Sequence, residues 1–165
     1  MKLLIAYASK SGCAAEMSAL LASLLPNHTV DLCDLSARMP DPAEFDYVVL
    51  GGSIRFNRAH KALRAYLAEY ADAIVGKPHT VFVCCAFGDQ VEHYYRIAFS
   101  REVLESAEQR VYFGGDLSLS RQRGFDKFLT RLLRRSILDG EEDGLFLPSL
   151  LPEHVRLLAD TLRKK

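Results

Sequence analysis

The sequence predicts a doubly wound α/β fold, in which one five-stranded parallel sheet carries helices on both faces. Five short apolar runs alternate along the chain with segments of helical periodicity. The first, third and fourth runs are almost continuously apolar, which is typical of strands covered on both faces. Because crossovers between parallel strands are right-handed, this alternation places helices on both sides of one sheet.

The second apolar run differs from the others, because Val30 and Leu32 alternate with polar residues and so indicate an edge strand. In the fourth run Cys84 and Cys85 are adjacent, and we expect their side chains to point to opposite faces. The five predicted strands are LLIAYA (3–8), HTVDLCDL (28–35), YVVLGGS (47–53), TVFVCCAF (80–87) and RVYFGGDL (110–117).

Four other segments have apolar residues on one helical face. A fifth segment, residues 89–107, predicts one broken helix or two. No linker rich in Gly, Pro and Ser divides the chain, so we expect a single domain over residues 1–165. The four apolar faces consist of Met17, Leu20, Leu21, Leu24 and Leu25; Leu63, Tyr66, Leu67, Tyr70 and Ile74; Phe125, Phe128, Leu129, Leu132 and Leu133; and Val155, Leu158, Ala159 and Leu162.

The amino-acid composition excludes several classes of function. The 21 Lys and Arg residues balance 21 Asp and Glu residues, so the net charge is zero and argues against general nucleic-acid binding. The four cysteines have no metal-ligand spacing, and we propose no metal. The apolar start of the chain is too short for a secretory signal, so we expect a cytoplasmic protein with reduced thiols.

Ligands of such sheets bind beyond the carboxyl ends of the strands. Three loops are expected there: SKSGCA (9–14), SIRFNRAH (53–60) and CAFGDQ (85–90). The first loop opens a helix, whose free N–H groups and partial positive charge suit a phosphate. Ser9 and Ser11 would add hydroxyl donors, and glycine would let the backbone approach closely. Alternatively, Ser11 simply caps the helix.

Other nucleotide and phosphate sites do not fit this sequence. The dinucleotide pattern GxGxxG and the Walker pattern GxxxxGK[ST] are absent. The first and third strands end on Ala8-Ser9 and Gly52-Ser53 rather than on the acidic residues of a phospho-acceptor domain. No arginine follows Cys13 at the spacing of a cysteine phosphatase. A site for a single phosphate therefore remains.

Four segments resemble the flavodoxins, and in particular flavodoxin-domain proteins that include the menaquinone-dependent protoporphyrinogen oxidases. YASKSGCA is similar to the flavodoxin phosphate loop, and FVCCAFGDQ to the third flavodoxin loop. VVLGGSIRFNRAHKALRAYL and VYFGGDLSLSRQRGFDKFLTRLLRRS resemble the oxidase-like branch. The resemblance implies the strand order 2-1-3-4-5 and an FMN cofactor. The FMN-binding residues that it implies are Ser9, Lys10, Ser11, Gly12, Cys13 and Ala14 at the phosphate, and Ser53, Ile54, Arg55, Phe56, Asn57, Ala86, Phe87, Gly88 and Asp89 around the ring.

The resemblance favours a small FMN-dependent oxidoreductase that passes electrons from a reduced donor to a quinone-type acceptor. One alternative is a flavodoxin-type electron carrier without an enzymatic activity. The other is a binding module that has lost FMN, because Ala14 stands where flavodoxins usually have threonine. The flavin would perform the redox chemistry, so we assign no catalytic side chain.

Basic residues gather in or just after the second loop, at Arg55, Arg58, His60 and Lys61. They would stabilise an anionic reduced flavin through the Coulomb interaction, or they form a solvated face. Phe56 in the same loop would cover the flavin ring or belong to the core.

Residues 121–135 predict a basic amphipathic helix, with several arginines around an apolar face that holds two phenylalanines. Such a helix would lie on an anionic membrane, where a quinone is found, or would simply cover the sheet. The expected partner is therefore a redox protein or a quinone, with peripheral membrane contact through this helix as one hypothesis.

Overall fold

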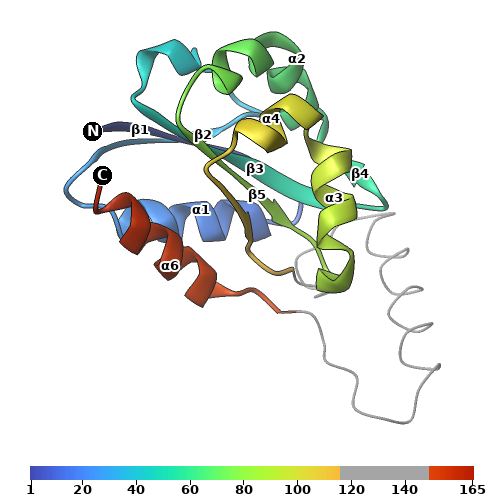
Figure 1. Ribbon diagram of the computed structural model, residues 1–165. Helices are drawn as coiled ribbons and strands as arrows, with labels where there is room; N and C mark the ends of the chain where they lie inside the picture. The colour runs from blue at the N-terminus through green and yellow to red at the C-terminus, as the bar shows by residue number, and fades with distance from the viewer. Residues whose placement is uncertain (116–148) are drawn as a thin grey trace.

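A parallel sheet with the strand order β2-β1-β3-β5-β6 forms the middle layer of the protein (Figure 1). The computed structural model describes residues 1–115 and 149–165. In the numbering of the apolar runs this order is 2-1-3-4-5, so the predicted topology is confirmed. The parallel strands are β1 (Lys2–Ala8), β2 (Thr29–Asp34), β3 (Tyr47–Arg55), β5 (His79–Cys84) and β6 (Gln109–Tyr112).

Helices cover both faces of the sheet, as predicted. Helices α1 and α6 lie on one side, and α2, α3 and α4 lie on the other (Figure 1). The helices are α1 (Cys13–Ser23), α2 (Lys61–Val75), α3 (Val91–Ala98), α4 (Arg101–Ser106) and α6 (Pro152–Leu162), with short 3-10 turns η1 (Pro42–Glu44) and η2 (Gly88–Gln90).

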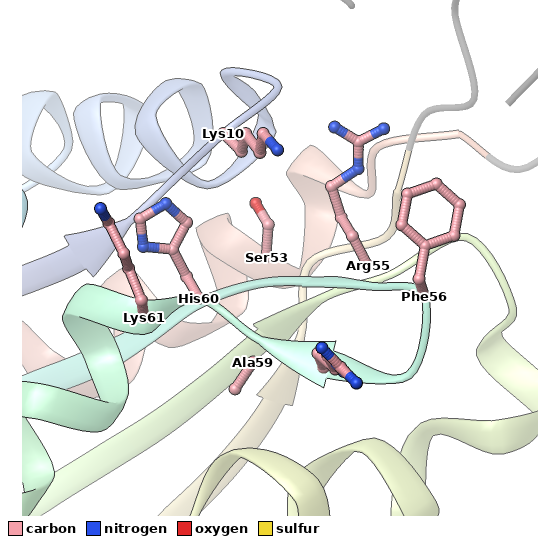
Figure 2. A pocket seen from close by; sticks show the side chains of 8 residues that line it. Lys10, Ser53, Arg55, Phe56, Ala59, His60 and Lys61 are labelled. Atoms are coloured by element: carbon pink, nitrogen blue, oxygen red, sulfur yellow. The ribbon is translucent and has the colours of Figure 1, made fainter. Parts of the chain in front are cut away.

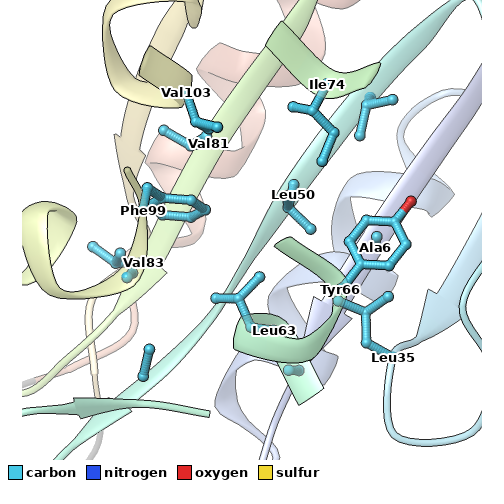
Figure 3. Close-up of a cluster of buried hydrophobic side chains, with 14 of the residues drawn as sticks. Ala6, Leu35, Leu50, Leu63, Tyr66, Ile74, Val81, Val83, Phe99 and Val103 are labelled. Carbon is cyan, nitrogen blue, oxygen red and sulfur yellow. The ribbon is translucent and has the colours of Figure 1, made fainter. Parts of the chain in front are cut away.

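Two hydrophobic cores follow from the alternation of side chains along the strands. On β1, Leu4 and Ala6 face α2, while Leu3 and Ile5 face α1 and α6. The larger core contains Tyr66 of α2, whose ring packs over the sheet (Figure 3). Because both faces are covered, β3 and β5 are buried at almost every position, as the continuous apolar runs in the sequence indicated.

The sequence located most of the other elements as well. Cys84 and Cys85 lie in different cores, as expected from their alternation. Residues 89–107 form two helices, because the hydroxyl of Ser100 accepts the N–H of Val103 and starts α4. Strand β2 lies at the edge of the sheet, as predicted, and Leu32 on it is 38% exposed.

The predicted helix with the apolar face Phe125–Leu133, and the basic segment 121–135, lie outside the described residues. The fourth predicted face is confirmed, because Val155, Leu158 and Leu162 of α6 are fully buried against α1 and the sheet. Within the described ranges, no helix combines the length and the apolar character that crossing a membrane requires.

Gly51 is required by the close approach of β3 to β5. A β-carbon at this position would overlap the carbonyl oxygen of Phe82 and lie 2.6 Å from its ring. Neither atom can move, since β3 is paired on both sides and the ring stacks on Phe113. Gly76 at the end of α2 is different, because a β-carbon there meets nothing closer than 3.6 Å.

We therefore expect Gly51→Ala to lower the free energy of unfolding by about 3 kcal/mol, at the upper end of what overpacking causes. The matched control is Gly76→Ala, whose backbone φ of −75° suits alanine. It should change stability by less than about 1 kcal/mol, or raise it slightly by restricting the unfolded chain. Urea denaturation measures both. Equal stability of the two variants would contradict this account of the sheet.

Helix α2 is capped by a histidine. The Nδ1 atom of His60 accepts a hydrogen bond from the N–H of Ala62 at 3.3 Å, which only the neutral ring can do. Partial burial lowers the pKa of His60 below 6.5, and the positive charges of Lys61 and Lys10 lower it further against the opposing effect of Asp34. The folded protein therefore resists protonation of this ring.

Because the folded-state pKa is the lower one, the unfolded chain takes up the proton first as the pH falls. The stability from this cap is present above pH 6.5 and is lost as the pH drops through the folded-state pKa. In His60→Asn, which keeps a capping acceptor without a titration, the loss between about pH 7 and about pH 5 should be smaller, by no more than the roughly 1 kcal/mol that a helix cap contributes. Denaturation midpoints across this range measure the difference, and parallel pH profiles would refute the role of His60.

Candidate functional site

Three loops meet at the carboxyl edge of the sheet, as the topology predicted. β1, β3 and β5 run parallel, with Ala8 opposite Gly52 and Ser53 opposite Cys84. The strands therefore end together, and the segments that follow them are neighbours in space. The expected residues lie as follows: Ser9, Lys10, Ser11 and Gly12 in the first loop, Cys13 and Ala14 in α1, Ser53, Ile54 and Arg55 in β3, Phe56 and Asn57 in the turn after it, Ala86 and Phe87 after β5, and Gly88 and Asp89 in η2.

The first loop exposes an uncapped helix start. Gly12 is the N-cap residue of α1 and has a φ of 90°, in the left-handed region that favours glycine. α1 has no side-chain cap, so the alternative in which Ser11 caps this helix is wrong. The hydroxyl of Ser9 instead accepts the N–H of Gly12 at 3.1 Å and holds the loop closed. The first N–H groups of α1 thus lack a side-chain acceptor, which suits an anion.

Cys13 and Ala14 contribute differently from the loop residues before them. Both side chains are buried in the core between α1 and the sheet, and Ala14 is completely inaccessible. The thiol of Cys13 also accepts a hydrogen bond from the hydroxyl of Ser11 in the loop, at 3.6 Å. The alanine in place of the usual threonine therefore fills a core position in this protein.

The second loop forms a β-hairpin where the sequence indicated a plain loop. β3 extends to Arg55, and the short strand β4 (Arg58–Ala59) pairs back on it in antiparallel register. Phe56 and Asn57 form the two-residue turn, with φ values of 48° and 59°. This geometry is that of a common two-residue hairpin turn, in which both central residues have positive φ and the turn twists in the same sense as the two strands.

Phe56 is strained and exposed at the same time. A bulky aromatic residue is an outlier in the left-handed region, and such strain is concentrated at functional sites. Its side chain is 42% exposed, so the alternative in which Phe56 belongs to the core is wrong. Ile54, by contrast, is buried in the α2 core, so its side chain points away from the loops.

A hydrogen bond that sequence analysis missed holds the hairpin in place. The Nε2 atom of His93 in α3 lies 2.9 Å from the Oδ1 atom of Asn57. It joins the turn to the helix that follows the third loop. The two residues are 36 positions apart, and no local pattern in the sequence connects them.

A cleft of about 450 Å³ lies between the first loop and the hairpin (Figure 2). Ser53 at its floor is only 4% exposed, and its hydroxyl is buried without a hydrogen-bond partner. A buried hydroxyl without a partner is unfavourable unless a ligand completes it. The residues that line the cleft are Lys10, Ser53, Arg55, Phe56, Arg58, Ala59, His60 and Lys61.

The cleft is strongly basic. The structure brings together the predicted cluster of Arg55, Arg58, His60 and Lys61, and adds Lys10 from the opposite loop. The Arg55 guanidinium also lies 5.5 Å from the centroid of the Phe56 ring, within the range of a cation–π contact. No acidic side chain belongs to the cleft lining in the described part of the chain. The site is therefore suited to an anionic ligand.

The third loop lies beside the cleft but does not line it. Phe87 is 36% exposed, and a side chain at Gly88 would crowd the ring of Tyr112. The hydroxyl of Tyr112 donates to the carbonyl oxygen of Cys85 at 2.8 Å, which fixes the start of the loop. Burial raises the pKa of the Cys85 thiol to about 12, so it stays protonated and is a poor nucleophile.

Neither a metal cluster nor an exposed thiol occurs among the described residues. Across 1–115 and 149–165, no three His, Cys, Asp or Glu side chains are grouped to hold a metal. All four cysteines are buried and free. The features of this edge are the uncapped start of α1, the exposed rings of Phe56 and Phe87, and the basic side chains that line the cleft, which we call the basic wall.

The sequence is similar to a quinone-linked dehydrogenase. It is 25% identical over 153 residues to Protoporphyrinogen IX dehydrogenase (quinone) of Escherichia coli strain K12, and the alignment covers 87% of this chain and 83% of that protein.

The fold is similar to that of solved flavodoxins. The flavodoxin of Streptococcus pneumonia TIGR4 superposes with a TM-score of 0.53 at 13% identity, over 86% of this chain and 100% of that one. Rubredoxin oxygen:oxidoreductase from Desulfovibrio gigas gives a TM-score of 0.53 at 12% identity, over 99% of this chain and 36% of that one. A family model described as a flavodoxin domain matches residues 4–143. This chain therefore belongs to the flavodoxin domain family.

Proposed function

We propose that this protein binds FMN at the carboxyl edge of the sheet and acts as a small oxidoreductase that passes electrons to a quinone-type acceptor. The observation that carries the proposal is the hydroxyl of Ser53, which is buried at the cleft floor without a partner. FMN, when bound, supplies electron transfer in one- or two-electron steps, while the protein orients it and tunes its potential.

The residues fit the phosphate end of FMN. The uncapped start of α1 offers backbone N–H groups, and the left-handed Gly12 keeps the approach open, since nothing lies within 4 Å of where its β-carbon would be. Lys10 lines the cleft on the side of the first loop, and Ser53, which the resemblance assigned to the ring end, lies at the cleft floor and would bind the phosphate in this proposal. A phosphate accepts hydrogen bonds from all of these groups, so it would give the buried Ser53 hydroxyl the partner that it lacks.

The aromatic residues fit the ring end. Phe56 and Phe87 follow neighbouring strands and are among the few exposed large apolar side chains in the described residues. A flavin ring packed against these side chains would cover one face of each, which gives a reason for a strained and exposed phenylalanine at the hairpin turn. The contact between His93 and Asn57 would hold Phe56 in position.

The basic wall favours an oxidoreductase over a low-potential electron carrier. Two-electron reduction leaves a flavin that tends to be anionic at neutral pH, and positive charges lower the energy of that form. The similarity to a quinone-linked dehydrogenase supports a quinone as acceptor. Turnover with a soluble quinone analogue separates the enzyme from the carrier, and the absorption spectrum of the purified protein separates both from a module without FMN.

We expect Ser53→Ala to weaken FMN binding about tenfold, because it removes one hydrogen bond to a charged phosphate. It should not destabilise the FMN-free protein, since the hydroxyl has no partner there. The chain offers a matched control in Ser18→Ala, which removes another buried, unpartnered hydroxyl, on α1. Quenching of FMN fluorescence during titration measures the affinity of each variant.

Equal FMN affinity of Ser53→Ala and the wild type would show that this hydroxyl does not face the cofactor. Absence of saturable FMN binding to the wild type at micromolar protein would refute the proposal as a whole. The Ser18 variant detects any general effect of removing a buried hydroxyl, because it should bind FMN as the wild type does.

The reduction potential provides a second test. Arg55 lies on the cleft wall beside the Phe56 ring, so a negative charge there should oppose the reduced flavin anion. Each exposed charge contributes about 1 kcal/mol or less, and Arg55→Glu should lower the two-electron potential by some tens of millivolts. Arg156→Glu, an equal charge change on the exposed side of α6, should leave it nearly unchanged. Spectroelectrochemistry decides, and identical potentials for wild type and Arg55→Glu would remove the electrostatic argument for the oxidoreductase.

A further inference from the structure

Three exposed cations form a ridge along the mouth of the cleft. Arg58 lies in β4, and Lys61 and Arg64 lie in the first turn of α2. We call these three residues the basic ridge. All three side chains are exposed, and no ion pair with another described residue involves them. Their charge therefore faces solvent, in a protein whose total charge is zero.

The fold does not account for this ridge. The N-terminus of a helix carries a partial positive charge and favours acidic residues, but the first turn of α2 contains no acid. Lys61 and Arg64 are three positions apart, so two like charges also share one helix face. Both placements oppose the stability of α2. Cations that weaken their own element, and that pair with no acidic side chain among the described residues, suit an external partner of negative charge.

The surroundings of the ridge are those of a protein interface. Phe56, which is 42% exposed, lies two residues before Arg58 at the tip of the same hairpin. Arginines and aromatic residues are enriched in protein interfaces and dominate their binding energy. α2 contributes no large exposed apolar side chain, so the ridge lacks the apolar face by which a helix inserts into a lipid surface.

We propose that the basic ridge docks an acidic redox protein, whose carboxylates surround its own redox centre and meet Arg58, Lys61 and Arg64. Docking there would bring the partner's centre to the mouth of the FMN cleft, since Arg58 and Lys61 also line it. The inference rests on the proposed function, because it takes the cleft as the place where electrons leave or arrive. Opposite charges would steer the encounter and set the orientation of the two proteins.

The test measures binding, with an acidic [2Fe–2S] ferredoxin as the probe and the full FMN-treated chain as its partner. Calorimetric titration at about 20 mM salt should show saturable binding, which weakens at least about tenfold near 300 mM as the charges are screened. The double variant Arg58→Glu/Lys61→Glu should also weaken binding at least about tenfold. It should fold, because glutamate at position 61 suits the start of α2.

The matched control is Arg156→Glu/Lys164→Glu, which makes the same change in net charge at exposed positions on or just after α6, the helix on the opposite face of the sheet. It should weaken ferredoxin binding no more than about twofold. Equal losses in the two double variants would overturn the ridge as a docking site, because the effect would then follow net charge alone.

Three further results would overturn the inference: no ferredoxin binding at low salt, equally tight binding of the basic protein cytochrome c, or ridge-dependent binding to phosphatidylglycerol vesicles without ridge-dependent binding to ferredoxin. FMN titration of the same samples keeps the two proposals apart. Failure to bind FMN refutes the proposed function, whereas ferredoxin binding by the untreated chain reports on the ridge alone.

Discussion

The parallel pairing of β1, β3 and β5 is the constraint on which the rest of the molecule depends. It requires close backbone approach, and Gly51 and Gly52 provide it, since a β-carbon at either would collide with a carbonyl oxygen of the neighbouring strand. The register that results ends the three strands together and brings their loops to one edge. The uncapped start of α1, the hairpin and the loop before η2 are neighbours only because of this pairing.

The topology and cores could be predicted because they follow from periodicity, which is a property of neighbouring residues. The apolar face of α6 and the opposite burial of Cys84 and Cys85 are examples. The hairpin between Ile54 and Ala59 could not be predicted, because its turn contains no glycine and puts Phe56 at positive φ. Tertiary contacts, including the bond from His93 to Asn57, stabilise a backbone that local propensity disfavours.

The candidate site was predicted as a set of loops rather than as a set of contacts. The predicted topology was enough to place the first loop, with Lys10, beside the basic residues of the second loop. It did not show that Ala14 and Ile54 point into the cores, because the direction of a side chain at the end of an element depends on a register of one residue. Nor did it show that the hydroxyl of Ser53 lacks a partner, since that depends on every atom around it.

Several departures from stable local structure lie at the carboxyl edge of the sheet. Phe56 and Asn57 have left-handed backbones, Ser53 buries a hydroxyl without a partner, and cations occupy the start of α2. Each is unfavourable for the protein alone, and the proposed ligands would compensate for them: the flavin ring by covering Phe56, its phosphate by bonding to Ser53, and the carboxylates of an acidic partner by pairing with the cations. Strain and unsatisfied groups are retained where binding compensates for them. A stable scaffold elsewhere permits this, because both cores are closed and the helices that cover them lie where the sequence predicts.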